Sequence, residues 1–175
     1  MGTGKSPATK NGKIVTYALF HGSPSTDIEE FDISKAGTNT GSSEHFLFFT
    51  DSYDEADDFS YERTETSSMF VAGRGKKGKV YEVDVTMKKP LDLTNLSDTD
   101  IKNILKMDST GGELTVDLIK HFSKGNNQLL KAYMDLDKIT KYGYDGFIAR
   151  MYGVSNPTKE YAVVNVKQVK IKKGK

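Results

Sequence analysis

Cysteine is absent from the 175-residue sequence, which excludes disulfide bonds, thiolate zinc sites and a cysteine nucleophile. Long apolar runs are also absent: no stretch approaches the roughly 20 residues that a membrane-spanning helix needs. The pattern of a secretory signal, a charged segment followed by an apolar one, is lacking as well. These absences predict a cytoplasmic protein that does not associate with membranes.

A strong excess of charge of either sign is lacking too. The 25 Lys and Arg residues are balanced by 24 Asp and Glu residues, so the formal net charge is only +1. Proteins whose main partner is nucleic acid usually carry a clear basic excess. The balance therefore disfavours nucleic acid as the main partner without excluding local contacts.

The length and the apolar pattern predict one domain. Residues 1–13 are polar and are expected to form a disordered arm, and residues 14–175 form the domain. Strands are expected at 14–20, 46–50, 69–72, 79–88, 146–151 and 160–171. Helices are expected from 53 to about 59 and at 97–106, 112–122 and 126–141, with loops at 34–44 and 73–78. Because regular alternation of strand and helix is missing, the order predicts an α+β fold with largely antiparallel sheets.

Two local patterns support these assignments. Ser52 and Glu55 have the spacing of a capping box, and Tyr53, Ala56 and Phe59 share one face of the helix that it opens. The acidic residues of this helix are interpreted as its solvated face, and no metal site is expected. Residues 79–88 alternate between apolar and polar side chains, as a half-buried strand does.

A glycine pattern in the middle of the chain is misleading. Gly73, Gly75 and Gly78 satisfy the spacing G-x-G-x-x-G. A dinucleotide-binding fingerprint must follow a strand and open a helix, but this segment leads into the strand at 79–88. We interpret it as a flexible basic hairpin loop.

Three separated segments carry the residues of a candidate site. His21, Gly22 and Ser23 stand where the first strand gives way to a turn, and Gly22 leaves room for a flat ligand to approach the backbone. Residues 46–51 offer aromatic walls. Glu160 opens an otherwise apolar strand. Burying a carboxylate there costs free energy unless it pairs with another group or takes part in binding or catalysis.

Together these segments resemble the diphtheria-toxin-like and PARP-like branch of the ADP-ribosyltransferases, which carries an H-Y-E triad on three strands. The matching motifs are LFHGS, FLFFTDSYDEADDF and KEYAVVNVKQVKI. KVYEVDVTMKKPLDL and YGYDGFIAR are similar to the ADP-ribosyltransferase domains of phage polyvalent proteins. The resemblance covers residues 17–172. It implies two packed, mostly antiparallel sheets around an NAD cleft, with flanking helices.

The resemblance also implies roles for the polar residues. His21 would bind the adenosine ribose, and the backbone of Gly22 would hold the nicotinamide carboxamide with the Ser23 hydroxyl nearby. Glu160 would bind the hydroxyls of the nicotinamide ribose. Its carboxylate would stabilise the positive charge that develops on that ribose as nicotinamide leaves.

The aromatic part of the family pattern is less complete. Phe48 stands where the triad has Tyr, so the ring is kept and the phenol hydroxyl is lost. Phe49 and the small residue Ala56 complete the second motif. Phe59 is the expected second aromatic of the nicotinamide sandwich, with Tyr61 as the competitor for that place.

By this resemblance the chain is a phage or bacterial enzyme that needs no metal and works in the cytoplasm or is delivered into a host cytoplasm. It would cleave NAD+ and transfer mono-ADP-ribose to an acceptor, with protein favoured over nucleic acid. Thr158 stands two residues before Glu160, where arginine-specific members have Glu, so arginine is disfavoured as the acceptor. Residues 152–159 would form the acceptor-recognition turn.

Other interpretations stay open. Because of Phe48, the fold could be an NAD-binding or structural module with weak or no activity. An enzyme of the same fold that acts on nucleic acid is a further alternative. Taken singly, His21 could be a structural hydrogen-bonding residue and Glu160 an edge-strand charge, while His45 and His121 are read as loop and helix-surface residues.

Overall fold

The computed structural model describes residues 13–36, 46–63, 74–108, 112–125, 127–131, 133, 136–151 and 158–173. The arm expected at 1–13, apart from its last residue, lies outside this part of the chain. The strand expected at 69–72, His45 and most of the acceptor-recognition turn also lie outside it. No helix in the described part is both long enough and apolar enough to cross a bilayer.

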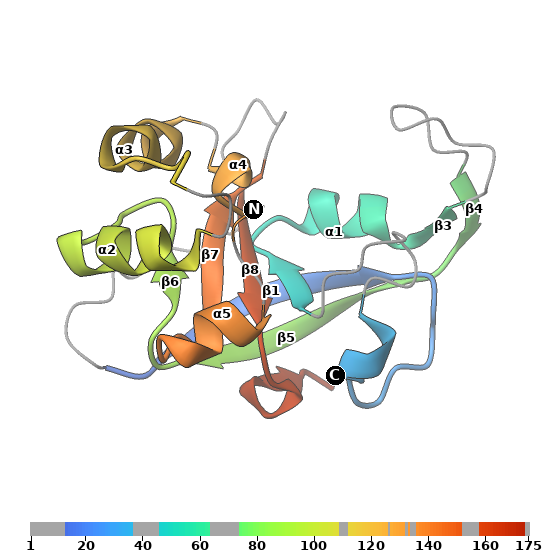
Figure 1. Cartoon of the computed structure of the whole chain (residues 1–175). Helices are drawn as coiled ribbons and strands as arrows, with labels where there is room; N and C mark the ends of the chain where they lie inside the picture. Colours follow the sequence, from blue (N-terminus) through green and yellow to red (C-terminus); the bar gives the residue numbers. More distant parts are fainter. Residues whose placement is uncertain are drawn as a thin grey trace.

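Seven strands form one mixed sheet in the order β6-β7-β8-β2-β1-β5-β9 (Figure 1). They are β1 (Val15–Ser23), β2 (Leu47–Thr50), β5 (Lys79–Met87), β6 (Leu91–Asp92), β7 (Gly146–Arg150), β8 (Lys159–Val163) and β9 (Val169–Ile171). Neighbours are antiparallel except for β6 and β7, which are parallel. The α+β class is therefore confirmed.

The sheet bends sharply between β1 and β2. These strands pair at Phe20 and Thr50, whereas β1 follows β5 along its whole length. Beyond this point β1 and β5 run across the direction of β7 and β8 (Figure 1). The expected pair of separate packed sheets is thus corrected: two halves of one continuous sheet face each other.

Apolar side chains from both halves fill the space between them. The rings of Tyr17 on β1 and Tyr161 on β8 lie 4.9 Å apart, although the two strands are not neighbours in the sheet. Val83 and Val85 on β5 are fully buried in the same cluster. The alternating pattern at 79–88 predicted these buried positions correctly.

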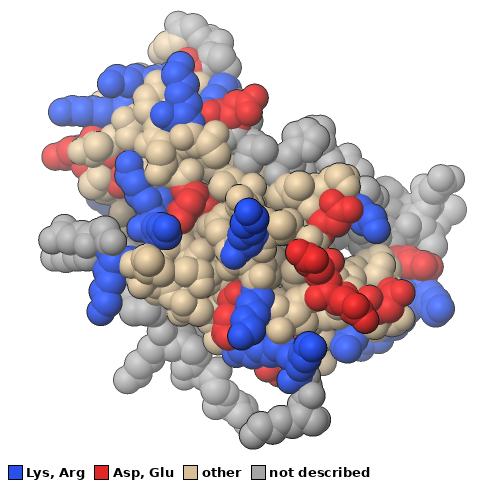
Figure 2. Space-filling model, turned by 90° about the horizontal axis from the view of Figure 1, so that it is seen from below, with Lys and Arg blue, Asp and Glu red and all other residues tan. Residues whose placement is uncertain are grey.

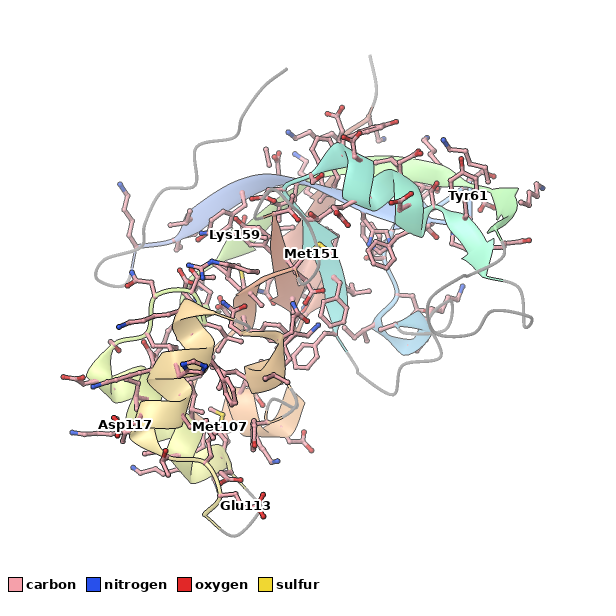
Figure 3. The ribbon with its side chains drawn as sticks, turned by 90° about the horizontal axis from the view of Figure 1, so that it is seen from above. Tyr61, Met107, Glu113, Asp117, Met151 and Lys159 are labelled. Carbon is pink, nitrogen blue, oxygen red and sulfur yellow. The ribbon has the colours of Figure 1, made fainter. Side chains whose placement is uncertain are left out.

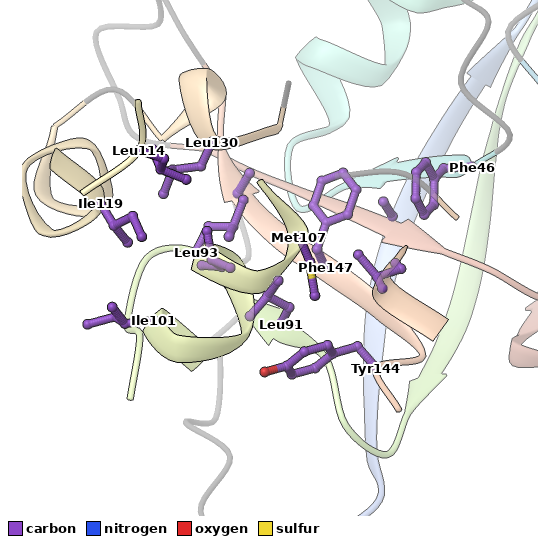
Figure 4. Close-up of a cluster of buried hydrophobic side chains, with 14 residues drawn as sticks. Phe46, Leu91, Leu93, Ile101, Met107, Leu114, Ile119, Leu130, Tyr144 and Phe147 are labelled. Carbon is purple, nitrogen blue, oxygen red and sulfur yellow. The ribbon is translucent and has the colours of Figure 1, made fainter. Parts of the chain in front are cut away.

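Helices cover the outer face of the half that contains β7 and β8, where they form a second core (Figure 4). They are α2 (Asp98–Met107), α3 (Val116–Lys124), α4 (Gln128–Lys131) and α5 (Leu136–Lys141). Ile104, Ile119 and Leu130 are fully buried in this core and fix three of the helices on the sheet.

A short helix, α1 (Tyr53–Phe59), packs on the end of β1. Ser52 caps it by accepting a hydrogen bond from Glu55 N, but Ser52 N donates to Thr50 Oγ1, so only half of the expected capping box forms. Ala56 is buried and Tyr53 is exposed, so the expected apolar face is narrower than the spacing indicates.

Three expected elements are wrong in detail. The loop expected at 73–78 contains β4 (Arg74–Lys77), which pairs with β3 (Tyr61–Arg63) in a small second sheet. The single helix expected at 126–141 is split into α4 and α5. The last expected strand is interrupted by η2 (Val166–Gln168), because the side chains of Asn165 and Gln168 cap this turn reciprocally.

The remaining boundaries follow local caps. α3 begins four residues later than expected, because Thr115 Oγ1 accepts a hydrogen bond from Leu118 N and so starts the helix there. The segment after β1 turns through a short 3-10 helix, η1 (Ile33–Lys35). His121 is exposed on α3, as predicted.

Candidate active site

A cavity of about 860 Å³ opens where β1 and β2 part after the Phe20–Thr50 pair. Its size is that of a typical small-molecule site. Eight of the predicted residues line it: His21, Gly22, Ser23, Phe48, Phe49, Ala56, Phe59 and Glu160. The ninth, Tyr61, does not. Tyr61 lies on β3, far from Met151 and Lys159 at the strand ends beside Glu160 (Figure 3).

His21 connects the two strands at the opening. Its Nδ1 lies 2.8 Å from the carbonyl oxygen of Phe48, which can only accept, so Nδ1 carries the hydrogen. Burial lowers the pKa of His21 below its ordinary value, and the Phe48 carbonyl offsets this in part. The imidazole is therefore neutral at pH 7, with Nε2 as a hydrogen-bond acceptor. A ribose hydroxyl is a donor that matches it.

The ring of His21 is fixed by aromatic neighbours. Its centroid lies 4.9 Å from that of Phe31 and 5.4 Å from that of Phe49. Phe49 is 2 % exposed and belongs to the core between the sheet halves. Phe49 therefore supports His21 from behind and contributes mainly to the floor of the cavity.

Gly22 is required for a reason that the sequence did not indicate. A Cβ at this position would lie 1.7 Å from the carbonyl oxygen of Ala56 and 2.8 Å from Ser60 N. The missing side chain therefore makes room for the backbone of α1, whether or not a ligand is bound. The predicted use of the Gly22 backbone to hold a carboxamide remains a prediction.

Ser23 ends β1 at the mouth of the cavity. Its Oγ accepts a hydrogen bond from Ser25 N at 3.2 Å, which shapes the turn that follows. A hydroxyl keeps one hydrogen to donate in addition. Ser23 can thus shape the turn and still contact a ligand.

Glu160 lies on an interior strand. Its backbone is in register with Thr50 on one side and with Ala149 on the other, so the alternative of an edge-strand charge is wrong. Asp51 fastens the end of β2 to the start of β8: Asp51 Oδ1 accepts from Lys159 N at 2.8 Å, and Asp51 N donates to Lys159 O at 3.3 Å. Burial raises the pKa of Asp51. These contacts fix the backbone that presents Glu160.

Phe48 and Glu160 lie on the same face of the sheet. Glu160 is the register partner of Thr50, and Thr50 is two residues after Phe48 on β2, so all three side chains point to one side. The Phe48 ring packs against Phe147, with centroids 6.1 Å apart. Phe59 lines the cavity from α1. The predicted aromatic wall thus contains Phe48 and Phe59 but not Tyr61.

Lys131, which belongs to none of the three motifs, completes the site. Lys131 Nζ lies 2.6 Å from Glu160 Oε1 and 4.8 Å from the centroid of the Phe48 ring. Glu160 Oε1 is buried and has no aligned hydrogen bond among the described residues, so this contact is a close charge pair rather than a directed hydrogen bond. Lys131 comes from α4, 29 residues before Glu160, and no spacing rule links the two.

No group of three or more His, Asp or Glu residues that could hold a metal ion occurs in the part of the chain that the structure describes. Between His21 and Glu160 the cavity offers an imidazole, a carboxylate with its lysine partner, and the hydroxyl of Ser23. They suit an organic ligand that carries hydroxyl groups and a positive charge.

The chain belongs to the family described as "ADP-Ribosyltransferase in polyvalent proteins", whose pattern it matches over residues 10–175. The resemblance carried by the three motifs is therefore confirmed at the level of the family. Neither a curated protein nor a solved structure matches the chain.

Proposed function

We propose that this protein cleaves the bond between nicotinamide and ribose in NAD+ and transfers the ADP-ribose to an acceptor, with His21, Phe48 and Glu160 in the roles of the H-Y-E triad. One observation carries the proposal. In a member of this family, a neutral imidazole, an aromatic ring and a carboxylate fixed on an interior strand line a single cavity. NAD+ offers a matching group to each of them.

The adenosine half of NAD+ is bound at the β1 side of the cavity in this proposal. His21 Nε2 accepts a hydrogen bond from a hydroxyl of the adenosine ribose. Because Nδ1 is hydrogen-bonded to the Phe48 carbonyl, the orientation of the imidazole is fixed and Nε2 remains the acceptor. Gly22 and Ser23 hold the carboxamide of the nicotinamide, whose ring lies between Phe48 and Phe59.

Glu160 supplies the charge that the reaction needs. The bond between the ribose carbon C1′ and the nicotinamide nitrogen breaks, and nicotinamide leaves as a neutral molecule with the electron pair. Positive charge then builds up on the ribose, and a fixed carboxylate stabilises it. An acceptor nucleophile forms the new bond to C1′ and releases a proton. Loss of one such electrostatic contact costs about 3 kcal/mol, or about two orders of magnitude in rate.

Protein is favoured over nucleic acid as the acceptor because the rim of the cavity is acidic. Asp27, Glu29, Glu30 and Asp32 line it on one side. On the face seen in Figure 2, Lys and Arg side chains lie in separate groups among Asp and Glu. A polyanionic acceptor is repelled by such a rim, whereas a protein segment with neutral or basic residues is not.

A second candidate is an NAD-binding module with little or no activity. Phe48 favours it, because this ring can stack on nicotinamide but cannot donate the hydrogen bond of the family's Tyr. The Lys131 ammonium favours it as well, since it neutralises Glu160 in the ligand-free protein.

Transfer of label from NAD+ separates the two candidates. The protein is incubated with a lysate and NAD+ labelled in the adenylate phosphate, beside Glu160→Gln and the matched control Glu82→Gln, which changes an exposed carboxylate on β5. We expect label on protein with wild type and Glu82→Gln, and a loss of about a hundredfold with Glu160→Gln. Binding of NAD+ without transfer by wild type would favour the module. Label that nuclease removes would move the acceptor to nucleic acid.

A further inference from the structure

We infer that Lys131 is an internal competitor for the cationic half of NAD+ and so sets the selectivity of the site for charged over neutral forms of the nicotinamide ring. The inference rests on the proposed function, because it assigns NAD+ to the cavity. It adds a residue that neither the sequence motifs nor the family pattern placed in the site.

The position of the ammonium defines a cation subsite. Two different groups that attract positive charge converge there: Glu160 Oε1 at 2.6 Å and the face of the Phe48 ring at 4.8 Å from its centroid. The side chains of Lys131 and Glu160 are each only 14 % exposed, so water screens the pair weakly. Carboxylate and ring are the two groups that the proposed reaction assigns to the nicotinamide riboside.

The position of Lys131 is built into the fold. Leu130 beside it is fully buried in the helix-side core, and Gln128 Nε2 donates to the carbonyl oxygen of Arg150 at 2.6 Å. Asn127 Oδ1 accepts from Arg150 N at 2.7 Å. The two hydrogen bonds fasten the start of the short α4 to the end of β7, and Leu130 anchors its last turn in the core. The ammonium is thereby directed at the cavity and does not extend into solvent.

A ligand that brings positive charge to this subsite must move the ammonium away. NAD+ can replace it, because its own charge then pairs with Glu160. NADH has a neutral ring, which neither repels the ammonium nor pairs with Glu160, so its binding leaves the ion pair between Lys131 and Glu160 in place. In the wild type the apparent affinity for NAD+ is the intrinsic affinity multiplied by the fraction of molecules in which Lys131 has left the subsite.

Removal of the ammonium is therefore expected to increase affinity for NAD+ selectively. If the ammonium occupies the subsite about nine-tenths of the time, its removal tightens NAD+ binding about tenfold. The affinity for NADH changes less, because binding of its neutral ring does not require the ammonium to leave Glu160. The ratio of the two affinities isolates the charge effect from any general change in the cavity.

Calorimetric titration with NAD+ and with NADH tests this for wild type, Lys131→Met and Lys131→Arg. Met keeps an unbranched stem without the charge, and Arg keeps the charge. We expect the preference for NAD+ to rise about tenfold with Met and to stay within about twofold of wild type with Arg. In a Glu160→Gln background, Lys131→Met is expected to leave the preference unchanged. Thermal unfolding checks that each variant is folded, and Lys131→Gln replaces Met if that variant is not.

An unchanged or reduced preference for NAD+ in the folded Lys131→Met or Lys131→Gln variant overturns the inference. Nicotinamide release is measured on the same variants after a cell lysate is added as the source of acceptor. Release by wild type together with an unchanged preference overturns the inference alone. Absence of release together with the expected shift in preference overturns the proposed enzyme and leaves the inference standing. Absence of any NAD+ binding overturns both.

Discussion

Acid should destabilise this protein through His21, and the effect can be worked out from its surroundings. Burial lowers the pKa of His21 in the folded protein below the ordinary value of 6.5. The unfolded chain therefore binds a proton at this residue more readily than the folded one does. The contribution of His21 to the free energy of unfolding is therefore fully present above about pH 6.5. It is lost as the pH falls below that value.

The unfolded state sets the magnitude. At pH 5.5, one unit below the ordinary pKa of 6.5, protonation stabilises the unfolded chain by about 1.4 kcal/mol. This is the upper limit of the loss, reached when the folded protein takes up no proton at His21. A carboxyl with a raised folded-state pKa, such as Asp51, acts in the opposite sense and at lower pH. A comparison of variants is therefore needed rather than a single pH profile.

Urea unfolding at about pH 7.5 and pH 5.5 measures the difference. We expect wild type to lose about 1 kcal/mol more than His21→Asn between the two conditions. His121→Asn, which changes an exposed histidine on α3, is the matched control and should behave as wild type does. Equal losses in wild type and His21→Asn would refute the argument that desolvation keeps His21 neutral, and with it the assignment of Nε2 as an acceptor.

Two further predictions concern the neighbours of His21. Gly22→Ala puts a Cβ 1.7 Å from the Ala56 carbonyl oxygen, so α1 must shift and the free energy of unfolding should fall by about 3 kcal/mol in urea titration. An unchanged unfolding midpoint would mean that α1 does not pack on β1 in this way. Phe48→Tyr restores a phenol hydroxyl beside Glu160, and nicotinamide release should rise about tenfold through one added hydrogen bond to a charged group. A rate equal to or below that of wild type would show that the hydroxyl has no role here.

Local patterns in the sequence predicted the elements whose stability is local. The alternation at 79–88 and the apolar stripe at 97–106 identified β5 and α2, because side-chain periodicity acts within a few residues. β4 was missed because its residues, Arg74–Lys77, are polar or glycine and pair only with β3. Its strand character comes from its partner, and a pattern within the segment cannot reveal that.

The same distinction holds for the candidate site: residues in motifs were predicted from the sequence, and contacts made by packing were not. His21, Phe48 and Glu160 were found from motifs, and all three line one cavity. The reason for Gly22 was not foreseen, because α1 contacts it from a distant part of the chain. Lys131 was missed because its ion pair with Glu160 joins a short helix to a strand. Such a contact follows from the packing of the helices on the sheet and leaves no periodic trace in the sequence.

Release of nicotinamide from NAD+ tests the central claim most directly. The protein is incubated with NAD+ labelled in the nicotinamide ring and with a cell lysate as the source of acceptor, and free nicotinamide is counted over time beside Glu160→Gln and Glu82→Gln. The proposed function predicts release by wild type and by Glu82→Gln, and a rate about a hundredfold lower with Glu160→Gln at saturating NAD+. Equal rates in wild type and Glu160→Gln, or no release by wild type that binds NAD+, would contradict it.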